Sequence, residues 1–190
     1  MKEQDIIRAA FERHLAIAAM ARESLTAPIA KAATMLIDCL KSGGKILICG
    51  NGGSAADAQH FAAELTGRYL RERRGLPAVA LTTDSSALTA IGNDFGFDRI
   101  FSRQIEALCS SDDLVLLIST SGNSRNLLAA AEAARLKLAP SVALLGRDGG
   151  SLAPLVDCAV IVPSDDTQRI QEVHALVLHL WCEWLEPSFS

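Results

Sequence analysis

Short apolar runs alternate along the chain with longer amphipathic stretches. Five runs rich in Val, Ile and Leu predict strands at 45–49, 78–82, 114–119, 141–146 and 159–163. Runs that are apolar at almost every position are typical of strands buried on both faces of a parallel sheet. The remaining segments follow the helical period, which predicts helices at about 2–23, 27–42, 54–67, 85–91, 98–109, 123–136 and 167–186.

This alternation of strand and helix predicts the fold class. We expect an α/β domain with a doubly wound, mostly parallel five-stranded sheet of the flavodoxin-like kind. Because two helices precede the first strand, we expect residues 1–42 to form a helical extension that packs against another subunit or caps the sheet, and 43–190 to form the α/β core. A chain of 190 residues, 49% of them hydrophobic, is the size of a single domain.

Charge and cysteine content limit the kinds of binding partner and the cellular compartment that we expect. A net charge of −4 and a pI near 5.5 argue against binding to nucleic acid or to an anionic membrane. The five cysteines are scattered without a C-x-x-C pair, and no apolar leader or membrane span stands out, so we expect a cytoplasmic protein without disulfides. The basic run "GRYLRERRG" at 67–75 is interpreted as a solvated helix end, with Arg68 alone kept as a candidate anion ligand.

A glycine-rich segment, "CGNGGSAADAQHFAAEL" at 49–65, follows the first predicted strand. Gly50, Gly52 and Ala55 fit the pattern G-x-G-x-x-A, which is close to that of a dinucleotide-binding loop. An acidic residue, Asp84, follows the second predicted strand, as such a loop requires. The chain has no room for a separate substrate domain, however, and this weakens the dinucleotide interpretation.

The helix that this segment opens carries polar residues at regular spacing. Ser54 and Asp57 fit S-x-x-D, which predicts a capping box at the start of the helix. His60 and Glu64 are four residues apart and project from one helix face, a spacing suited to two ligands of one divalent ion. A pair on the protein surface has the same spacing, so the motif alone does not establish a metal site.

A second loop, "STSGNS" at 119–124, lies between a predicted buried strand and a predicted helix. Hydroxyl groups, free backbone N–H groups and the positive end of a helix dipole together make a phosphate-binding site. N-capping by Asn123 and turn formation are the alternative, but they account for only part of the loop. The sequence therefore predicts phosphate binding by Ser119, Thr120, Ser121 and Ser124.

The last predicted helix contains two of the four histidines, His174 and His179, among apolar residues. A histidine on an apolar helix face is usually a hydrogen-bonded core residue. Helical spacing does not decide which neighbour acts with His179. Glu172 is seven residues away and well aligned, whereas Gln171 is eight away and offset by about 80°.

Taken together, these motifs resemble the sugar isomerase (SIS) domain family, and within it the zinc-dependent phosphoheptose isomerases. The resemblance covers about residues 30 to 185 and rests on "GNGGSAADAQHFAAELTGRY", "TAIGNDFGF", "ISTSGNS" and "RIQEVHALVLH". It implies a structural role for His174 and one zinc ion per subunit, held by His60, Glu64, Gln171 and His179. It implies substrate contacts at Asn51, Gly52, Gly53, Asn93, Asp94, Ser119, Thr120, Ser121, Ser124 and Gln171.

The resemblance also implies an activity and an assembly. A member of this family converts sedoheptulose 7-phosphate into D-glycero-D-manno-heptose 7-phosphate through an enediol, as a step in the biosynthesis of heptose precursors such as those of lipopolysaccharide. Glu64 is then the base and His179 the acid, because moving a proton between C1 and C2 needs both. The family further implies a homotetramer whose sites lie where subunits meet.

The alternative from another class is a non-catalytic SIS module, a tetrameric adaptor similar to the replication-initiator-associating proteins. Those relatives share the fold and the loops but lack the glutamate at the position of Glu64. Its presence here favours the isomerase.

Overall fold

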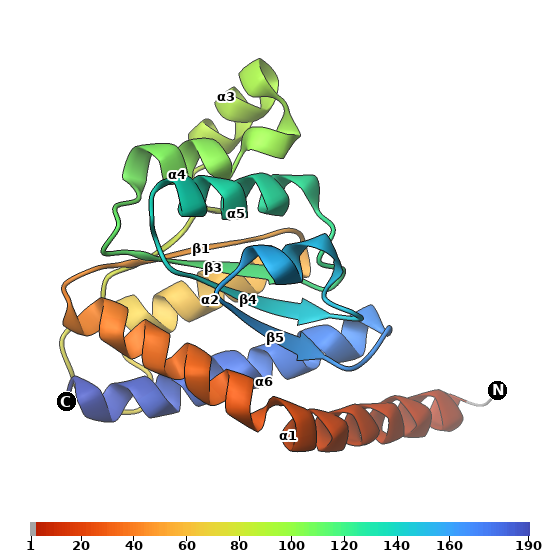
Figure 1. Ribbon diagram of the computed structural model, residues 1–190. Coiled ribbons are helices and arrows are strands. Elements are labelled where there is room, and N and C mark those ends of the chain that lie inside the picture. Colours follow the sequence, from red (N-terminus) through yellow and green to blue (C-terminus); the bar gives the residue numbers. More distant parts are fainter. Residues whose placement is uncertain (1–2) are drawn as a thin grey trace.

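The computed structural model describes residues 3–190, in which five strands form one sheet (Figure 1). The strands are β1 (Ile46–Gly50), β2 (Ala78–Ala80), β3 (Leu114–Ser119), β4 (Ser141–Gly146) and β5 (Cys158–Val162). Their order is β2-β1-β3-β4-β5, and every neighbouring pair is parallel. The prediction of a doubly wound α/β fold is therefore confirmed, and the order is that of flavodoxin-like sheets.

Burial follows the predicted pattern closely. Every residue of β1, β3 and β4 is buried, as expected for central strands covered on both faces. The edge strand β2 is shorter than the predicted 78–82, because the chain leaves the sheet after Ala80. The other edge strand, β5, alternates between buried and partly exposed residues.

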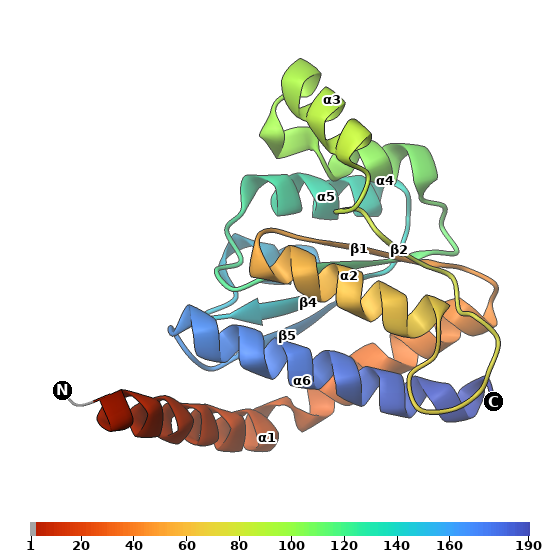
Figure 2. The ribbon, with the colours of Figure 1, turned by 180° about the vertical axis from the view of Figure 1, so that it is seen from behind.

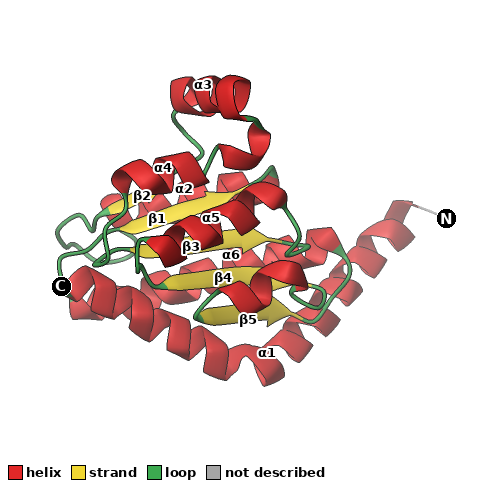
Figure 3. Ribbon diagram, turned by 45° about the horizontal axis from the view of Figure 1, so that its top comes forward, coloured by secondary structure: helices red, strands yellow, loops and turns green. Residues whose placement is uncertain are grey.

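Helices cover both faces of the sheet, so that the domain has three layers (Figures 1 and 3). One apolar core joins the sheet to α1, α2 and α6, and a second core joins its other face to α4 and α5. The described helices are α1 (Glu3–Lys41), α2 (Gly53–Thr66), α3 (Ser85–Phe95), α4 (Ser102–Leu108), α5 (Arg125–Leu136) and α6 (Thr167–Leu185), with short 3-10 turns at Phe97–Arg99, Gly150–Leu155 and Glu186–Ser188. No helix among these residues is both long enough and apolar enough to cross a membrane.

The N-terminal extension is one helix, not the two predicted at 2–23 and 27–42. Position 2 lies outside the described residues, and α1 runs without interruption from Glu3 to Lys41 through Pro28. Proline removes one helical hydrogen bond, and the helix bends in its middle (Figure 1). Leu25 and Ala32, on either side of Pro28, are buried in the core beneath the sheet, and this packing outweighs the local penalty.

Candidate active site

Two loops meet where β1 and β3 end. In the parallel ladder Gly50 pairs with Ile118, so Asn51 and Ser119 follow at the same edge of the sheet. The strand order reverses between β1 and β3, and doubly wound sheets bind ligands at such a switch point. The side-chain amide of Asn51, in the first loop, and that of Asn126, in the first turn of the helix after the second loop, form reciprocal hydrogen bonds of 3.0 and 2.8 Å. The two predicted binding loops are therefore neighbours held in a fixed relation.

Helix α2 begins earlier than the predicted capping box requires. Gly52 precedes the helix with a φ of +58°, a conformation that favours glycine. The N-terminus of α2 has no side-chain cap. Ser54 lies inside the first turn, so the predicted capping box with Asp57 is wrong. Asp57 is instead partly buried, and its Oδ2 has no hydrogen-bond partner among residues 3–190. Burial raises the pKa of this carboxyl group, and the neighbouring His60 opposes that shift.

The loop after β3 forms a turn closed by its own hydroxyl groups. The Ser119 hydroxyl accepts a hydrogen bond from the N–H of Gly122 (3.1 Å), and the Ser121 hydroxyl accepts one from the N–H of Asn123 (3.3 Å). Each hydroxyl retains its own proton, which can be donated to an oxygen-rich ligand. The residue that precedes α5 is Ser124 rather than Asn123, and its side chain makes no capping bond. Together with the N–H groups that begin α5, these donors suit a phosphate group.

His60, Glu64 and His179 come together between α2 and α6, which lie side by side (Figure 2). Nε2 of His60 is 3.1 Å from Oε1 of Glu64 and 3.4 Å from Nε2 of His179. Zinc bonds of about 2.0–2.1 Å in a tetrahedral site place neighbouring donors roughly 3.3 Å apart, so both separations match edges of such a site. Within residues 3–190, however, no three His, Cys, Asp or Glu side chains already surround a metal position. The donors fit zinc by type, and His60 is spaced suitably from each of the other two, but the donors contact one another directly.

The structure distinguishes the two alternatives on α6. Glu172 contacts Nδ1 of His14 at 2.6 Å, so its carboxylate is engaged with α1. Gln171 instead lies against the start of α2, where a Cβ atom on Gly53 would overlap its amide. Because an α-helix rises about 1.5 Å per residue, Gln171 and His179 are about 12 Å apart along α6. Gln171 thus lies at the loop end of the site, and its role as a zinc ligand stays a prediction.

His174 has the structural role that the resemblance implied. Its ring is completely buried, and Nε2 donates a hydrogen bond to the carbonyl of Leu145 (3.0 Å). Burial lowers the pKa of His174 to about 4, so the ring is neutral at physiological pH. Asp84, which a dinucleotide site would use, instead accepts the N–H of Ala87 and caps α3.

Asn93 and Asp94 are not joined to the two loops. They lie on α3, none of whose residues is buried and which projects from the body of the domain (Figure 1). In the described part of the chain their side chains bond to each other, with Asn93 Nδ2 donating to Asp94 Oδ1 at 2.8 Å. Their contact with substrate stays a prediction.

Three residues near the cluster had no predicted role. The ring of Tyr69 stacks on that of His179, with 5.7 Å between centroids. Arg73 and Glu186 form a buried ion pair beside it. The interpretation of 67–75 as a solvated helix end is wrong for Arg73, because α2 ends at Thr66 and its free carbonyl groups bind the guanidinium. The only feature of the sequence that could have indicated the role of Arg73 was the presence of an arginine near a helix end. Arg68 is exposed, as expected for a solvated residue that is free to bind an anion.

Comparisons with known proteins agree on one family. The SIS domain family model matches residues 11–146. The phosphoheptose isomerase of Aliarcobacter butzleri is 55% identical over 180 residues, which is 95% of either chain, and that of Helicobacter hepaticus is 57% identical over 97% of this chain and 94% of its own length.

Solved structures give the same result in three dimensions. The phosphoheptose isomerase of Neisseria gonorrhoeae has 47% sequence identity and a TM-score of 0.93. That of Francisella tularensis has 40% identity and a TM-score of 0.96. Each match covers 98% of this chain and 100% of the other. The chain therefore belongs to the SIS domain family and, within it, to the phosphoheptose isomerases.

Proposed function

We propose that the chain is an aldose–ketose isomerase that converts sedoheptulose 7-phosphate into D-glycero-D-manno-heptose 7-phosphate, a precursor for heptose-containing polymers such as lipopolysaccharide. The observation that carries the proposal is the contact of Glu64 with His60, and of His60 with His179, on two adjacent helices of a SIS fold. A non-catalytic adaptor is not favoured, because Glu64 is present and the chain matches the isomerases named above over 94–95% of their length.

The proposed chemistry moves one proton and rearranges one carbonyl. Glu64 removes a proton from C1, while His179 donates a proton to the carbonyl oxygen at C2, and the product is an enediol. The hydroxyl on C1 then gives up its proton as C2 is protonated, which leaves an aldehyde at C1. Binding of the phosphate by the loop at Ser119–Ser124 holds the reacting carbons near Glu64.

His60, Glu64 and His179 would hold one zinc ion per subunit, and the predicted fourth ligand, Gln171, would have to reach the ion from the loop end of the site. Imidazole nitrogens and a carboxylate oxygen are zinc ligands, and the separations of 3.1 and 3.4 Å suit them. When bound, the ion would act as a Lewis acid toward the substrate oxygen atoms.

We further propose a cytoplasmic homotetramer with sites between subunits. The five cysteines are free and buried, which suits a reducing compartment. Apolar side chains on α1 and α6, including Leu15, Leu176 and Trp184, are about half or more exposed and line a groove of about 790 Å³. Helix α3 also lacks a buried residue, so a neighbouring subunit could cover it and complete the site at Asn93 and Asp94.

The deciding experiment is a conversion assay. Protein loaded with zinc is incubated with sedoheptulose 7-phosphate, and the products are separated and identified. We expect heptose 7-phosphate from this substrate and far less turnover of sedoheptulose, which lacks the phosphate. If a metal-loaded, folded protein gives no product, the adaptor function replaces the isomerase.

A further inference from the structure

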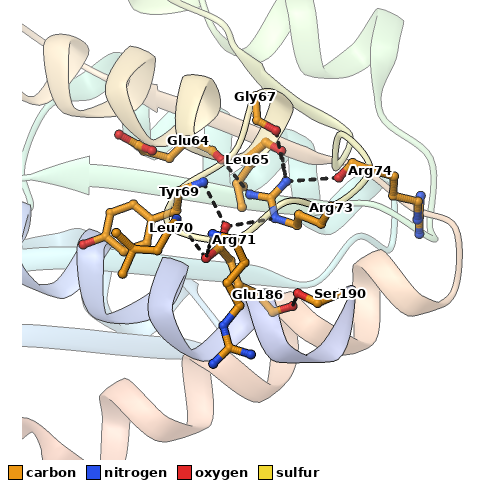
Figure 4. Close-up of polar contacts among 10 residues, drawn as sticks. All are labelled: Glu64, Leu65, Gly67, Tyr69, Leu70, Arg71, Arg73, Arg74, Glu186 and Ser190. Carbon is orange, nitrogen blue, oxygen red and sulfur yellow. Dashed lines mark hydrogen bonds and ion pairs between the residues drawn. The ribbon is translucent and has the colours of Figure 1, made fainter.

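The C-terminal end of α6 carries a carboxylate that is almost completely buried. Glu186 is 2% exposed, and its two oxygens accept hydrogen bonds from three successive backbone N–H groups, those of Tyr69, Leu70 and Arg71, each at 2.9 Å (Figure 4). Burial alone would raise the pKa of Glu186, but these three bonds outweigh it and hold the pKa below its usual value. The segment after α2 is therefore fixed to the end of α6 through its backbone.

A buried arginine completes this arrangement (Figure 4). The guanidinium of Arg73 donates to the carbonyl of Glu64 (2.7 Å), to that of Leu65 (2.9 Å) and, more weakly, to that of Gly67 (3.3 Å). These are carbonyl groups at the C-terminal end of α2, where a cation is favoured. Nε of Arg73 lies 3.4 Å from Glu186, close enough for an ion pair although not aligned as a hydrogen bond.

The pair is linked to both candidate catalytic residues, to Glu64 through its backbone and to His179 through Tyr69. Arg73 holds the backbone of Glu64 itself. Glu186 holds the backbone of Tyr69, whose ring stacks on the imidazole of His179 with an angle of 23° between the planes. Through these contacts the pair restrains the backbone of Glu64 and, by way of Tyr69, the ring of His179.

We propose that Arg73 and Glu186 are a positioning pair that sets the distance and orientation of Glu64 relative to His179, with Tyr69 transmitting the constraint to the imidazole. The inference rests on the proposed function for the roles of Glu64 and His179. A shift of about 1 Å in a reacting group is enough to lower turnover substantially, so the pair affects kcat more than substrate binding.

The test compares two equally buried carboxylates. In Glu186→Gln the side chain keeps its size but loses its charge. The matched control is Asp113→Asn, because Asp113 is also 2% exposed, accepts the N–H groups of Lys45 and Ser110, pairs with Lys45, and thus joins the segments before β1 and β3 to each other. We expect both variants to melt at lower temperature. Only Glu186→Gln should lose about tenfold or more in kcat, with KM within about twofold.

A second comparison isolates Tyr69. Tyr69→Leu removes the stacked ring and should reproduce the fall in kcat, whereas Tyr69→Phe keeps the ring and should recover most of it. If Glu186→Gln does not fold, Arg73→Lys replaces it, because lysine keeps the charge but cannot reach several carbonyl groups at once.

Histidine NMR provides a reading that does not depend on activity. The ring resonances of His179 should shift in Glu186→Gln but not in Asp113→Asn. If the wild type is inactive, the proposed function is refuted, but the His179 resonances of the two carboxylate variants can still be compared. Unchanged His179 resonances, or equal losses of kcat in both carboxylate variants, would show that Arg73 and Glu186 only stabilise the fold.

Discussion

Glu64 is the residue on which the proposed chemistry depends most. Glu64→Gln keeps the size and the helical propensity of the side chain, but an amide cannot accept a proton from carbon at neutral pH. We expect kcat to fall by about 10²- to 10⁴-fold, the usual contribution of a positioned base. Exchange of the C1 hydrogen of the substrate with deuterated solvent should stop as well. The value of kcat and the rate of this exchange can be measured on the same sample.

Substrate binding should survive this change, because the loop after β3 is untouched. Sedoheptulose 7-phosphate should therefore still raise the melting temperature of Glu64→Gln, as a ligand of the folded state does. Wild-type turnover and exchange in a variant that retains its metal would exclude Glu64 as the base. Asp57, with its unpartnered oxygen, would then be the next candidate.

His174 makes stability depend on pH in a predictable direction. Its pKa is about 6.5 in an unfolded chain and about 4 in the fold, so the unfolded state binds the proton more readily. The contribution of His174 to the free energy of unfolding is constant above pH 6.5. It decreases as the pH falls toward 4, by about 3 kcal/mol in total. His174→Gln removes the titration, so its free energy of unfolding, measured by urea denaturation, should fall less than that of the wild type between pH 7 and 4. Parallel curves would contradict this.

Single residues also mark where sequence reasoning was insufficient. Asp57 was assigned to a cap because S-x-x-D fits one, but a glycine at positive φ started the helix earlier. Arg73 was placed in solvent because its partners, the carbonyls of α2 and Glu186, are not encoded in any local pattern. Both errors concern which polar groups meet in space, and spacing along one segment does not contain that information.

The proposed phosphate site is formed by one element as a whole, the turn that joins β3 to α5. Ser124→Ala removes a hydroxyl that makes no capping bond, so it tests ligand binding with little effect on the loop. Loss of a hydrogen bond to a charged acceptor, about 1.5–3 kcal/mol, should raise KM by about tenfold to a hundredfold. Ser121→Ala should do the same and also loosen the turn, because it loses the N–H of Asn123. Unchanged KM in both variants would remove this loop from the site.

Elements were predicted best where apolar periodicity dominates. The bounds of β3 and β4 agree with the prediction at every residue, because a strand buried on both faces has an unbroken apolar run. Helix α1 was predicted as two, since Pro28 is a strong local signal and the packing of Leu25 and Ala32 beneath the sheet is a non-local one. The two loops were each identified from their own motif, and the strand order shows that they lie side by side.

At the scale of the whole molecule, stability and metal binding should be separable. Two apolar cores flank the sheet, and neither includes His60, whose side chain is 46% exposed. His60→Ala should therefore keep the melting temperature of the metal-free protein within a few degrees, while zinc occupancy after reconstitution falls well below one per subunit. Elemental analysis and thermal denaturation decide this together. A wild type that does not take up stoichiometric zinc would refute the proposed metal site.

The packing of α1 against α6 has a consequence for how the protein is made. The first helix leaves the ribosome early, whereas the helix that covers part of it is translated last. At typical rates of synthesis, the segment between Lys41 and Thr167 takes on the order of 10 s to appear. During that time Leu25 and Val177 cannot share a core, and α1 presents its apolar stripe to solvent. A nascent chain of this protein should therefore be a good chaperone client until its final helix emerges.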